Sequence, residues 1–336
     1  MNLAYFHLRA RPFRPTPDTQ SYYPAASHET ALHRLNQAIA ADEGIVVLTG
    51  APGTGKTLVG HLLLQRAGDI AAAFITNCRF GNRSELLKAV LFDLSQPYQG
   101  LGEQELRFAL TEYLLGNFQR DQKTIVLFDE AHDLTPDLLE ELRLLSNLES
   151  QRGKAVQIVA IGQPLLLEKL RLPELASLQQ RIAVRWQLEM LCREEAIEYM
   201  QHQIQVAGGE PAQIFGDEAL QIIAERTAGV PRLINQAASA CLALAESVEA
   251  ESVDTEVVLD ALSSLGLPST DAGEEEETVD ELRTATETNS TVPEYIAPKS
   301  GRGPLYFPGM HLNNLDSSSR SPRLHDVGSG PSSFTD

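Results

Sequence analysis

The feature that most constrains this chain is a glycine-rich loop between a predicted strand and a predicted helix. Residues 45–49 have the continuous hydrophobicity of a buried strand, and residues 50–57 follow the pattern Gly-x-x-x-x-Gly-Lys-Thr. An apolar helical pattern begins directly after the loop, at Leu58. A strand, a glycine-rich turn and a helix in this order form the structural context of a phosphate-binding loop. The sequence therefore predicts a nucleotide-binding protein.

The residue types in this loop suit the binding of phosphate. The glycines allow backbone conformations closed to other residues, so that main-chain N–H groups can turn toward phosphate oxygens. The helix that follows presents its positive dipole end to the same anion. We expect Lys56 to reach the β- and γ-phosphates and the Thr57 hydroxyl to bind Mg²⁺. The predicted nucleotide-binding residues are Gly50, Ala51, Pro52, Gly53, Thr54, Gly55, Lys56, Thr57 and Leu58.

A second part of the nucleotide site is predicted where a hydrophobic strand, residues 124–128, ends in Asp129-Glu130. We expect Asp129 to hold Mg²⁺ through water, which makes Thr57 and Asp129 the predicted metal residues. Glu130 is expected to polarise the attacking water as general base. Residues 129–132 also spell the Asp-Glu-Ala-His box of helicases. Such helicases need a second α/β domain, whereas the rest of this chain has helical patterns, so we set that interpretation aside.

Buried strands alternate with helices through the first part of the chain. The other predicted strands are residues 70–76, 124–128, 155–161 and 182–188, and the predicted helices are residues 28–41, 83–96, 103–120 and 136–150, with a further one opening at Pro173. Continuously hydrophobic strands alternating with helices indicate an α/β fold, here a parallel five-stranded sheet with helices on both faces.

The alternation stops near residue 191. Only helical patterns follow, at residues 194–206, 217–227, 231–246 and 255–265, and after residue 268 the chain becomes acidic and rich in Ser, Pro and Gly. The predicted domains are an N-terminal lead and helix (1–44), an α/β nucleotide-binding domain (45–190), a helical lid (191–267) and a disordered tail (268–336). Residues 304–308 are either a short docking peptide or part of a solvated tail. In the lead, Pro12 and Phe13 either cover the edge of the core or contact the base.

Composition bounds the class of protein. The length of 336 residues favours about two domains, and 43% hydrophobic residues are enough for a sizeable core. Three widely spaced cysteines in no metal-ligand spacing favour a reducing cytoplasm. Residues 1–14 lack the apolar run of a signal peptide, and no stretch approaches the roughly 18 apolar residues of a membrane span. We therefore expect a soluble, cytoplasmic protein without an integral membrane segment.

The charge of the chain opposes binding to nucleic acid in general. The net charge is −19. Residues 268–336 hold 12 acidic and 5 basic residues and contribute −7, which leaves −12 on residues 1–267. An acidic body is unfavourable for non-specific contact with phosphates, although a local basic face is still compatible with it.

Taken together, the Gly-x-Pro-Gly-x-Gly-Lys-Thr loop, the Asp-Glu strand end and the following helices resemble an AAA+ ATPase of the P-loop NTPase class. Within that class the chain resembles the ExeA/GspA family (general secretion pathway protein A), which is related to transposition ATPases of the TniB type. The stretches that carry the resemblance are residues 12–18, 161–164, 180–182 and 229–235, within a span of residues 4–262. The resemblance implies a 5-1-4-3-2 strand order and ATP as the nucleotide, since no motif in the sequence itself separates ATP from GTP.

The resemblance also implies roles for individual residues. Gln163 matches sensor 1 beside the γ-phosphate, and Arg232 matches sensor 2 in the lid. Arg181 matches the arginine finger offered to the ATP of a neighbouring subunit, with Arg185 as a rival. Asn77 matches a residue that restrains the catalytic glutamate, or it is a plain strand-end cap. The candidate catalytic residues are therefore Lys56, Glu130, Gln163, Arg181 and Arg232.

Three functions follow as hypotheses. The first is an ATPase that assembles into a homo-oligomeric ring or filament, hydrolyses ATP at subunit interfaces and remodels or switches an unidentified protein partner. Secretion-type members of the family continue into a membrane span and a periplasmic region, which we do not expect here. The second is a DNA-binding regulator of the transposition type acting on duplex DNA. The third is a nucleotide-gated interaction module without turnover.

Overall fold

The computed structural model describes residues 2–68, 70–150 and 153–267. The tail predicted for residues 268–336, with its candidate docking peptide, lies outside the described residues. None of the helices in the described ranges has the length and apolar character that a membrane span requires.

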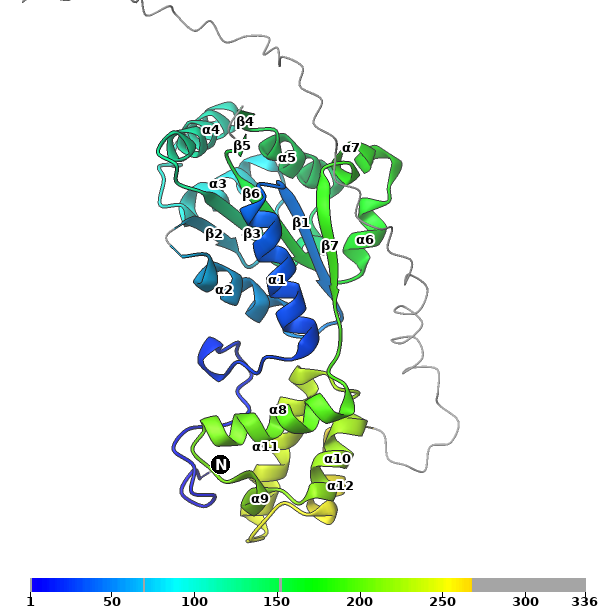
Figure 1. The fold of residues 1–336 in the computed structure, drawn as a ribbon. Coiled ribbons are helices and arrows are strands. Elements are labelled where there is room, and N and C mark those ends of the chain that lie inside the picture. Colours follow the sequence, from blue (N-terminus) through cyan, green and yellow to red (C-terminus); the bar gives the residue numbers. More distant parts are fainter. Residues whose placement is uncertain (1, 69, 151–152, 268–336) are drawn as a thin grey trace, which may run out of the picture. The chain divides into compact units, whose positions relative to one another are not determined.

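A parallel sheet lies at the centre of the first part of the chain (Figure 1). Its strands are β1 (Ile45–Gly50), β2 (Ala71–Ile75), β3 (Thr124–Phe128), β6 (Gln157–Gly162) and β7 (Ile182–Leu188). Their order is β2-β3-β6-β1-β7, and every neighbouring pair is parallel. This is the 5-1-4-3-2 order that the resemblance implies, so the predicted fold class is confirmed. Because all strands run the same way, the loops that follow them meet at one edge of the sheet.

Helices cover both faces of this sheet, as the continuous hydrophobicity of the strands predicts. The helices are α1 (Ala26–Ala40), α2 (Lys56–Ala67), α3 (Arg83–Asp93), α4 (Glu103–Gln119), α5 (Pro136–Ser146), α6 (Leu165–Leu170) and α7 (Ala176–Gln179). Alternate residues of β1 belong to two different cores: Val47 packs with residues of α3, α4 and α5, whereas Val46 and Leu48 pack with residues of α1 and α2. Burial on both faces fixes the register of the strands.

Several predicted boundaries are wrong by a few residues. The helix predicted to reach residue 96 ends at Asp93, because Ser95 takes a positive φ of 56° and reverses the chain. The helix predicted to reach residue 150 ends at Ser146, because a two-residue strand β4 (Glu149–Ser150) pairs with β5 (Gly153–Lys154). The helix predicted from Pro173 is a 3₁₀ turn, η3 (Pro173–Leu175), followed by the short α7.

The described residues after β7, up to residue 267, form helices, as predicted. They contain α8 (Arg193–Val206), α9 (Pro211–Ile214), α10 (Asp217–Arg226), α11 (Pro231–Ser247) and α12 (Thr255–Ser264). We refer to residues 191–267 as the lid. Side-chain caps define two of the helix starts: Cys192 and Glu195 form a capping box at α8, and Asp254 accepts a hydrogen bond from Val257 N at α12.

The N-terminal lead, residues 2–25, packs into the core of the lid. It has turns and one 3₁₀ helix, η1 (Thr19–Ser21). Phe6, Leu8 and Phe13 are buried among residues of the lid helices, and the Phe13 ring meets that of Phe215 edge to face with 6.2 Å between centroids. The Phe13 side chain is only 1% exposed, as expected of a residue that covers a core. The same residue also borders the cavity described below, so a contact with the base stays a prediction.

Candidate nucleotide-binding site

The predicted phosphate loop joins β1 to α2 at the carboxyl edge of the sheet. Gly53 and Gly55 have φ angles of +84° and +93°, in the region that glycine adopts readily. A side chain at Gly50 would place its Cβ 2.9 Å from the carbonyl oxygen of Leu188 on the neighbouring strand. The glycines are thus required by backbone conformation at two positions and by close packing at the third.

The Lys56 side chain folds back into this loop. Its Nζ donates a hydrogen bond of 2.9 Å to the carbonyl of Ala51, and the residue is buried. Burial lowers the pKa of Lys56, while the carboxylates of Glu130 and Asp129 act in the opposite direction. The ammonium group therefore lies within the loop, where it can contact an anion held by the main-chain N–H groups.

Thr57 and Asp129 meet although they are 72 residues apart. The Thr57 hydroxyl donates to Asp129 Oδ2 at 2.5 Å, and the Asp129 carboxylate is almost fully buried. Asp129 is placed by the end of β3, since its main-chain N–H donates to the carbonyl of Ile75 on β2 at 2.8 Å. Two oxygen groups at one point fit the coordination chemistry of Mg²⁺. Within the described ranges no three His, Cys, Asp or Glu residues gather to hold a metal, so a magnesium ion here would need further ligands from phosphate and water.

Glu130 follows Asp129 with an unusual backbone. Its φ of +55° is uncommon for a residue other than glycine, and its main-chain N–H donates to Asp129 Oδ1 at 2.9 Å. The side chain is 42% exposed, and its Oε2 lies 3.2 Å from Nδ1 of His132. The Glu130 side chain is thus partly exposed, unlike that of Asp129 directly before it.

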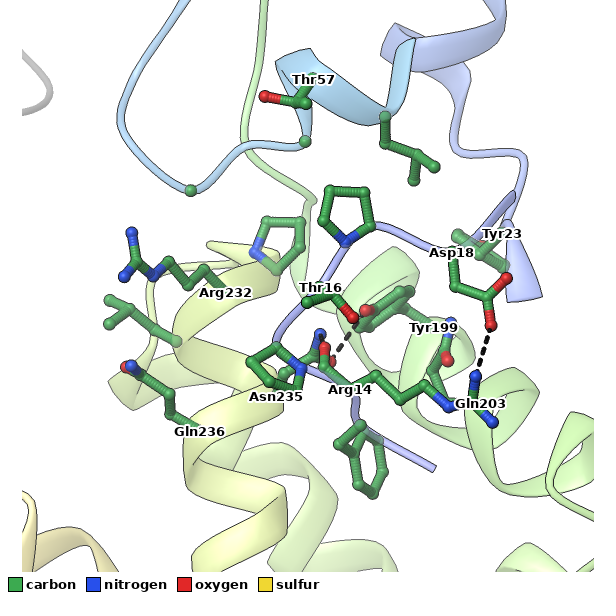
Figure 2. Close-up of a pocket in the computed structure, with 18 of the residues that line it drawn as sticks. Arg14, Thr16, Asp18, Tyr23, Thr57, Tyr199, Gln203, Arg232, Asn235 and Gln236 are labelled. Carbon is green, nitrogen blue, oxygen red and sulfur yellow. Dashed lines mark hydrogen bonds and ion pairs between the residues drawn. The ribbon is translucent and has the colours of Figure 1, made fainter. Parts of the chain in front are cut away.

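One cavity of about 870 Å³ brings most of the predicted site residues together. Its lining includes Pro52, Gly53, Gly55, Lys56, Thr57 and Leu58 of the loop, with Glu130, Gln163 and Arg232. Figure 2 shows Thr57 on one side of this cavity and Arg232, Asn235 and Gln236 on the other, with Thr16 of the lead between them. The volume is within the range of small-molecule sites. The remaining predicted loop residues, Gly50, Ala51 and Thr54, do not line the cavity; Thr54 is buried and its hydroxyl donates to the carbonyl of Ala51.

The two candidate arginine fingers lie elsewhere. Arg181 directly precedes β7, at the amino edge of the sheet and therefore opposite the phosphate loop. It lines a separate cavity of about 590 Å³ together with Arg143 and Lys154. Arg185 is an exposed residue within β7. Neither arginine lines the cavity that holds the phosphate loop of its own chain.

Asn77 is engaged locally. Its side chain is exposed, and its Oδ1 accepts a hydrogen bond of 3.0 Å from the main-chain N–H of Arg79. This is the geometry of the strand-end cap, one of the two alternatives that the sequence left open.

Sequence reasoning missed three residues beside the site. The Sγ of Cys78 donates to the carbonyl of Asp129 at 2.9 Å, and burial raises the pKa of this thiol to about 12. His28 is buried beside the loop, with Nε2 2.9 Å from the carbonyl of Thr54, and burial lowers its pKa. His132 lies between Glu130 and the end of β6. His132 belongs to the Asp-Glu-Ala-His run and was visible in the sequence; the other two carry no motif.

Known proteins resemble this chain in both sequence and structure. A family model described as an AAA domain matches residues 39–170. General secretion pathway protein A of Aeromonas hydrophila is 39% identical over 237 residues, which make up 70% of this chain and 43% of that protein. The chain therefore spans less than half the length of this relative.

Solved structures share the fold. The ORC2 protein of Aeropyrum pernix, in ADPNP–ADP complexes, has a TM-score of 0.56 at 15% identity. The match covers 70% of this chain and 66% of the ORC2 chain. The ORC1 protein of the same organism, in complex with DNA, has a TM-score of 0.57 at 20% identity. The match covers 75% of this chain and 68% of the ORC1 chain. At such identities the likeness concerns the fold alone. Together with the family match, these comparisons confirm the predicted resemblance: the chain has the AAA+ fold, its residues 39–170 match an AAA domain, and it is similar to general secretion pathway protein A.

Proposed function

We propose that this protein binds ATP with Mg²⁺ and hydrolyses it to ADP and phosphate. The observation that carries the proposal is the 2.5 Å hydrogen bond between Thr57 and Asp129. This bond joins the end of the phosphate loop to the acidic strand end. The cavity of about 870 Å³ that Thr57 lines is also lined by Glu130, Gln163 and Arg232. A loop with a buried cation beside paired acidic residues suits phosphoryl transfer, in which positioning and charge stabilisation do most of the work.

Each residue of the site has a defined task under this proposal. Lys56 and the loop N–H groups bind the β- and γ-phosphates, and Glu130 accepts a proton from the attacking water. Thr57 and Asp129 hold the magnesium ion, which neutralises charge on the phosphate oxygens when it is bound. Gln163 and Arg232 contact the γ-phosphate from the end of β6 and from the start of α11.

We further propose that the site is completed by a second copy of the chain in a ring or filament. Arg181 lies far from the phosphate loop of its own chain, at the opposite edge of the sheet, so it is available to the nucleotide of a neighbour. On the family resemblance, we propose a switch or remodelling ATPase that acts on a protein partner. We also propose a cytoplasmic location, on the number and spacing of the cysteines in the sequence.

The test is steady-state ATP hydrolysis measured over a range of protein concentrations, with Glu130→Gln as the matched variant. We expect specific activity to rise with concentration, and Glu130→Gln to abolish turnover while retaining ATP binding. Turnover near that of the wild type in Glu130→Gln would refute the assignment of the base. ATP binding without turnover in the wild type would favour the nucleotide-gated interaction module instead.

Regulation by DNA is a second candidate, supported by the fold shared with a protein solved in complex with DNA. The charge of −12 on residues 1–267 opposes it. Adding duplex DNA to the same assay separates the candidates. A several-fold rise in the rate of ATP hydrolysis would favour the DNA-regulated ATPase, provided that this rise becomes smaller as salt is added. A rate unaffected by DNA would favour a protein partner.

A further inference from the structure

Glu130 begins a short 3₁₀ turn, η2 (Ala131–Asp133), which lies between β3 and α5. The backbone of Glu130 is left-handed, with φ +55° and ψ +34°, a conformation that is uncommon for a residue other than glycine. Such a conformation persists only where the surrounding structure holds it. Because backbone angles fix the direction of the Cα–Cβ bond, the contacts of this turn decide where the Glu130 side chain can reach.

Both main-chain groups of Glu130 are hydrogen-bonded within the segment 129–134. The Glu130 N–H donates to Asp129 Oδ1, and the Glu130 carbonyl accepts from the N–H of Asp133, each at 2.9 Å. The next carbonyl, that of Ala131, accepts from the N–H of Leu134 at 3.1 Å. These bonds shape the turn, but they move with it. A contact from outside the segment is needed to hold the turn in place.

Lys169 on α6 supplies such a contact. Its ammonium donates to the carbonyl oxygens of His132 and Leu134, at the far end of the turn from Glu130. Both acceptors are main-chain groups, whereas the carboxylate of Asp133 in the same turn pairs with Arg79 at 2.9 Å. Hydrogen bonds from a charged donor are stronger than those between neutral groups. One half-buried side chain thus ties α6 to two successive points of the segment after β3.

The segment that carries Lys169 also holds the turn at a second place. The main-chain N–H of Gln163, at the end of β6, donates to Nδ1 of His132 at 3.4 Å. A Cβ placed on Gly162 would lie 3.2 Å from the main-chain nitrogen of His132, so β6 and the turn are closely packed. The turn is therefore held between the end of β6 and α6, and this segment joins Gln163 to Glu130.

We propose that Lys169 is a positioning residue for Glu130: its bonds to the carbonyls of His132 and Leu134 hold the turn that keeps Glu130 in its left-handed conformation at the nucleotide cavity. The inference rests on the proposed function, because the orientation of Glu130 affects a rate only if this residue acts as the base in ATP hydrolysis. Glu130 lines the cavity, whereas Lys169 does not. Lys169 therefore acts through the turn and not on the nucleotide.

The first test compares Lys169→Met and Lys169→Arg in ATP hydrolysis. Methionine keeps an unbranched side chain but lacks the donors, and a misplaced base can cost up to about 100-fold in rate, so we expect kcat to fall by roughly 10–100-fold. The dissociation constant for a fluorescent ATP analogue should change less than about threefold, because only the chemical step loses an interaction. A guanidinium can also donate to two carbonyls, so Lys169→Arg should keep kcat within about threefold of the wild type.

The matched control is Lys123→Met. Lys123 directly precedes β3, at the other edge of the sheet, and its ammonium also donates to a main-chain carbonyl, that of Ile39, at 3.2 Å. A purely structural role would lower the melting temperature of both methionine variants and leave kcat unchanged. A loss of kcat in Lys169→Met no greater than that in Lys123→Met, or a Lys169→Arg variant as slow as Lys169→Met, would overturn the inference.

A second measurement needs no turnover and separates a failure of this inference from a failure of the proposed function. The amide hydrogens of Asp133 and Leu134 are bonded within the turn, so their exchange with solvent reports how often the turn opens. We expect Lys169→Met to speed this exchange by at least about tenfold and to leave the amides of α5 unchanged. Unchanged exchange at Asp133 and Leu134 would overturn the inference even if the wild type hydrolyses ATP. Faster exchange in a protein that hydrolyses no ATP would show that Lys169 holds the turn and that the proposed function is wrong.

Discussion

The main-chain N–H of Arg232 donates a hydrogen bond of 3.2 Å to the carbonyl oxygen of Gly53. This bond joins the first turn of α11 in the lid directly to the phosphate loop. The contact is tight, because a Cβ at Gly53 would lie 2.9 Å from Arg232 Cβ and 3.0 Å from Val230 Cγ1. Any movement of the lid away from the nucleotide must therefore break a backbone contact with the loop itself.

Replacing Gly53 by alanine should push the lid away from the loop. We expect nucleotide affinity to fall by at least about tenfold, because the loop loses its conformation and Arg232 moves away from the phosphates. The measurement is the dissociation constant for a fluorescent ATP analogue. Gly100→Ala is the matched control: Gly100 also has a positive φ, +76°, but no atom lies within 4 Å of the Cβ position.

Both alanines carry the cost of a left-handed residue, about 1–2 kcal/mol, so both should lower the free energy of unfolding. Only Gly53→Ala should weaken nucleotide binding. Equal affinity in the two variants would show that the close approach of lid and loop is not needed for binding.

Phe13→Ala tests the packing of the lead into the lid. The Phe13 side chain is 1% exposed and lies against Phe215, so its removal should cost about 3–5 kcal/mol in the free energy of unfolding. Chemical denaturation measures this cost, and Phe92→Ala, at a site 63% exposed, should change stability far less. If Phe13→Ala instead weakened nucleotide binding and left stability unchanged, the contact with the base would be the correct role.

The grouping of the candidate site residues was largely predictable, because parallel strands bring their carboxyl ends to one edge. Once β1, β3 and β6 were assigned, Thr57, Asp129 and Gln163 had to lie close together, and the structure places them at that edge. The order of the strands needed the family resemblance, since hydrophobicity alone does not say which strands pair.

What the sequence did not predict rests on contacts between distant segments. Phe13 packs against residues about 200 positions later, and nothing in its local pattern distinguishes the lid from the sheet as its partner. The early end of α5 depends on the β4–β5 pairing, which competes with helix propensity. His28 contacts Thr54 only because α1 packs beside the loop.

The buried His28 should make stability depend on pH. Burial lowers its pKa below the ordinary value of 6.5, although the hydrogen bond to the Thr54 carbonyl and the carboxylates of Glu195 and Glu29 act in the opposite direction. Below pH 6.5, His28 binds a proton more readily in the unfolded chain than in the folded protein. The free energy of unfolding therefore falls as the pH decreases through about 6.5. The measurement is the melting temperature between about pH 7.5 and pH 5.5.

His28→Gln is the matched variant, because its side-chain N–H can still donate to the carbonyl of Thr54. It should show a smaller loss of stability over this range than the wild type does. Identical pH profiles in the two proteins would mean that His28 does not cause the dependence.

Mixing two inactive variants tests whether Arg181 acts in a neighbouring subunit. Arg181→Ala leaves the phosphate loop intact but lacks the finger, and its loss should lower the rate by about 10³–10⁵-fold. Glu130→Gln keeps the finger but lacks the base. In a mixed oligomer roughly a quarter of the interfaces would combine an intact Glu130 with an intact Arg181 from the next copy, so ATP hydrolysis should reappear on mixing.

If Arg181→Ala is active by itself and Arg185→Ala instead shows this complementation, Arg185 is the finger. Activity that never returns on mixing, for either arginine, would mean that each site is completed within one chain.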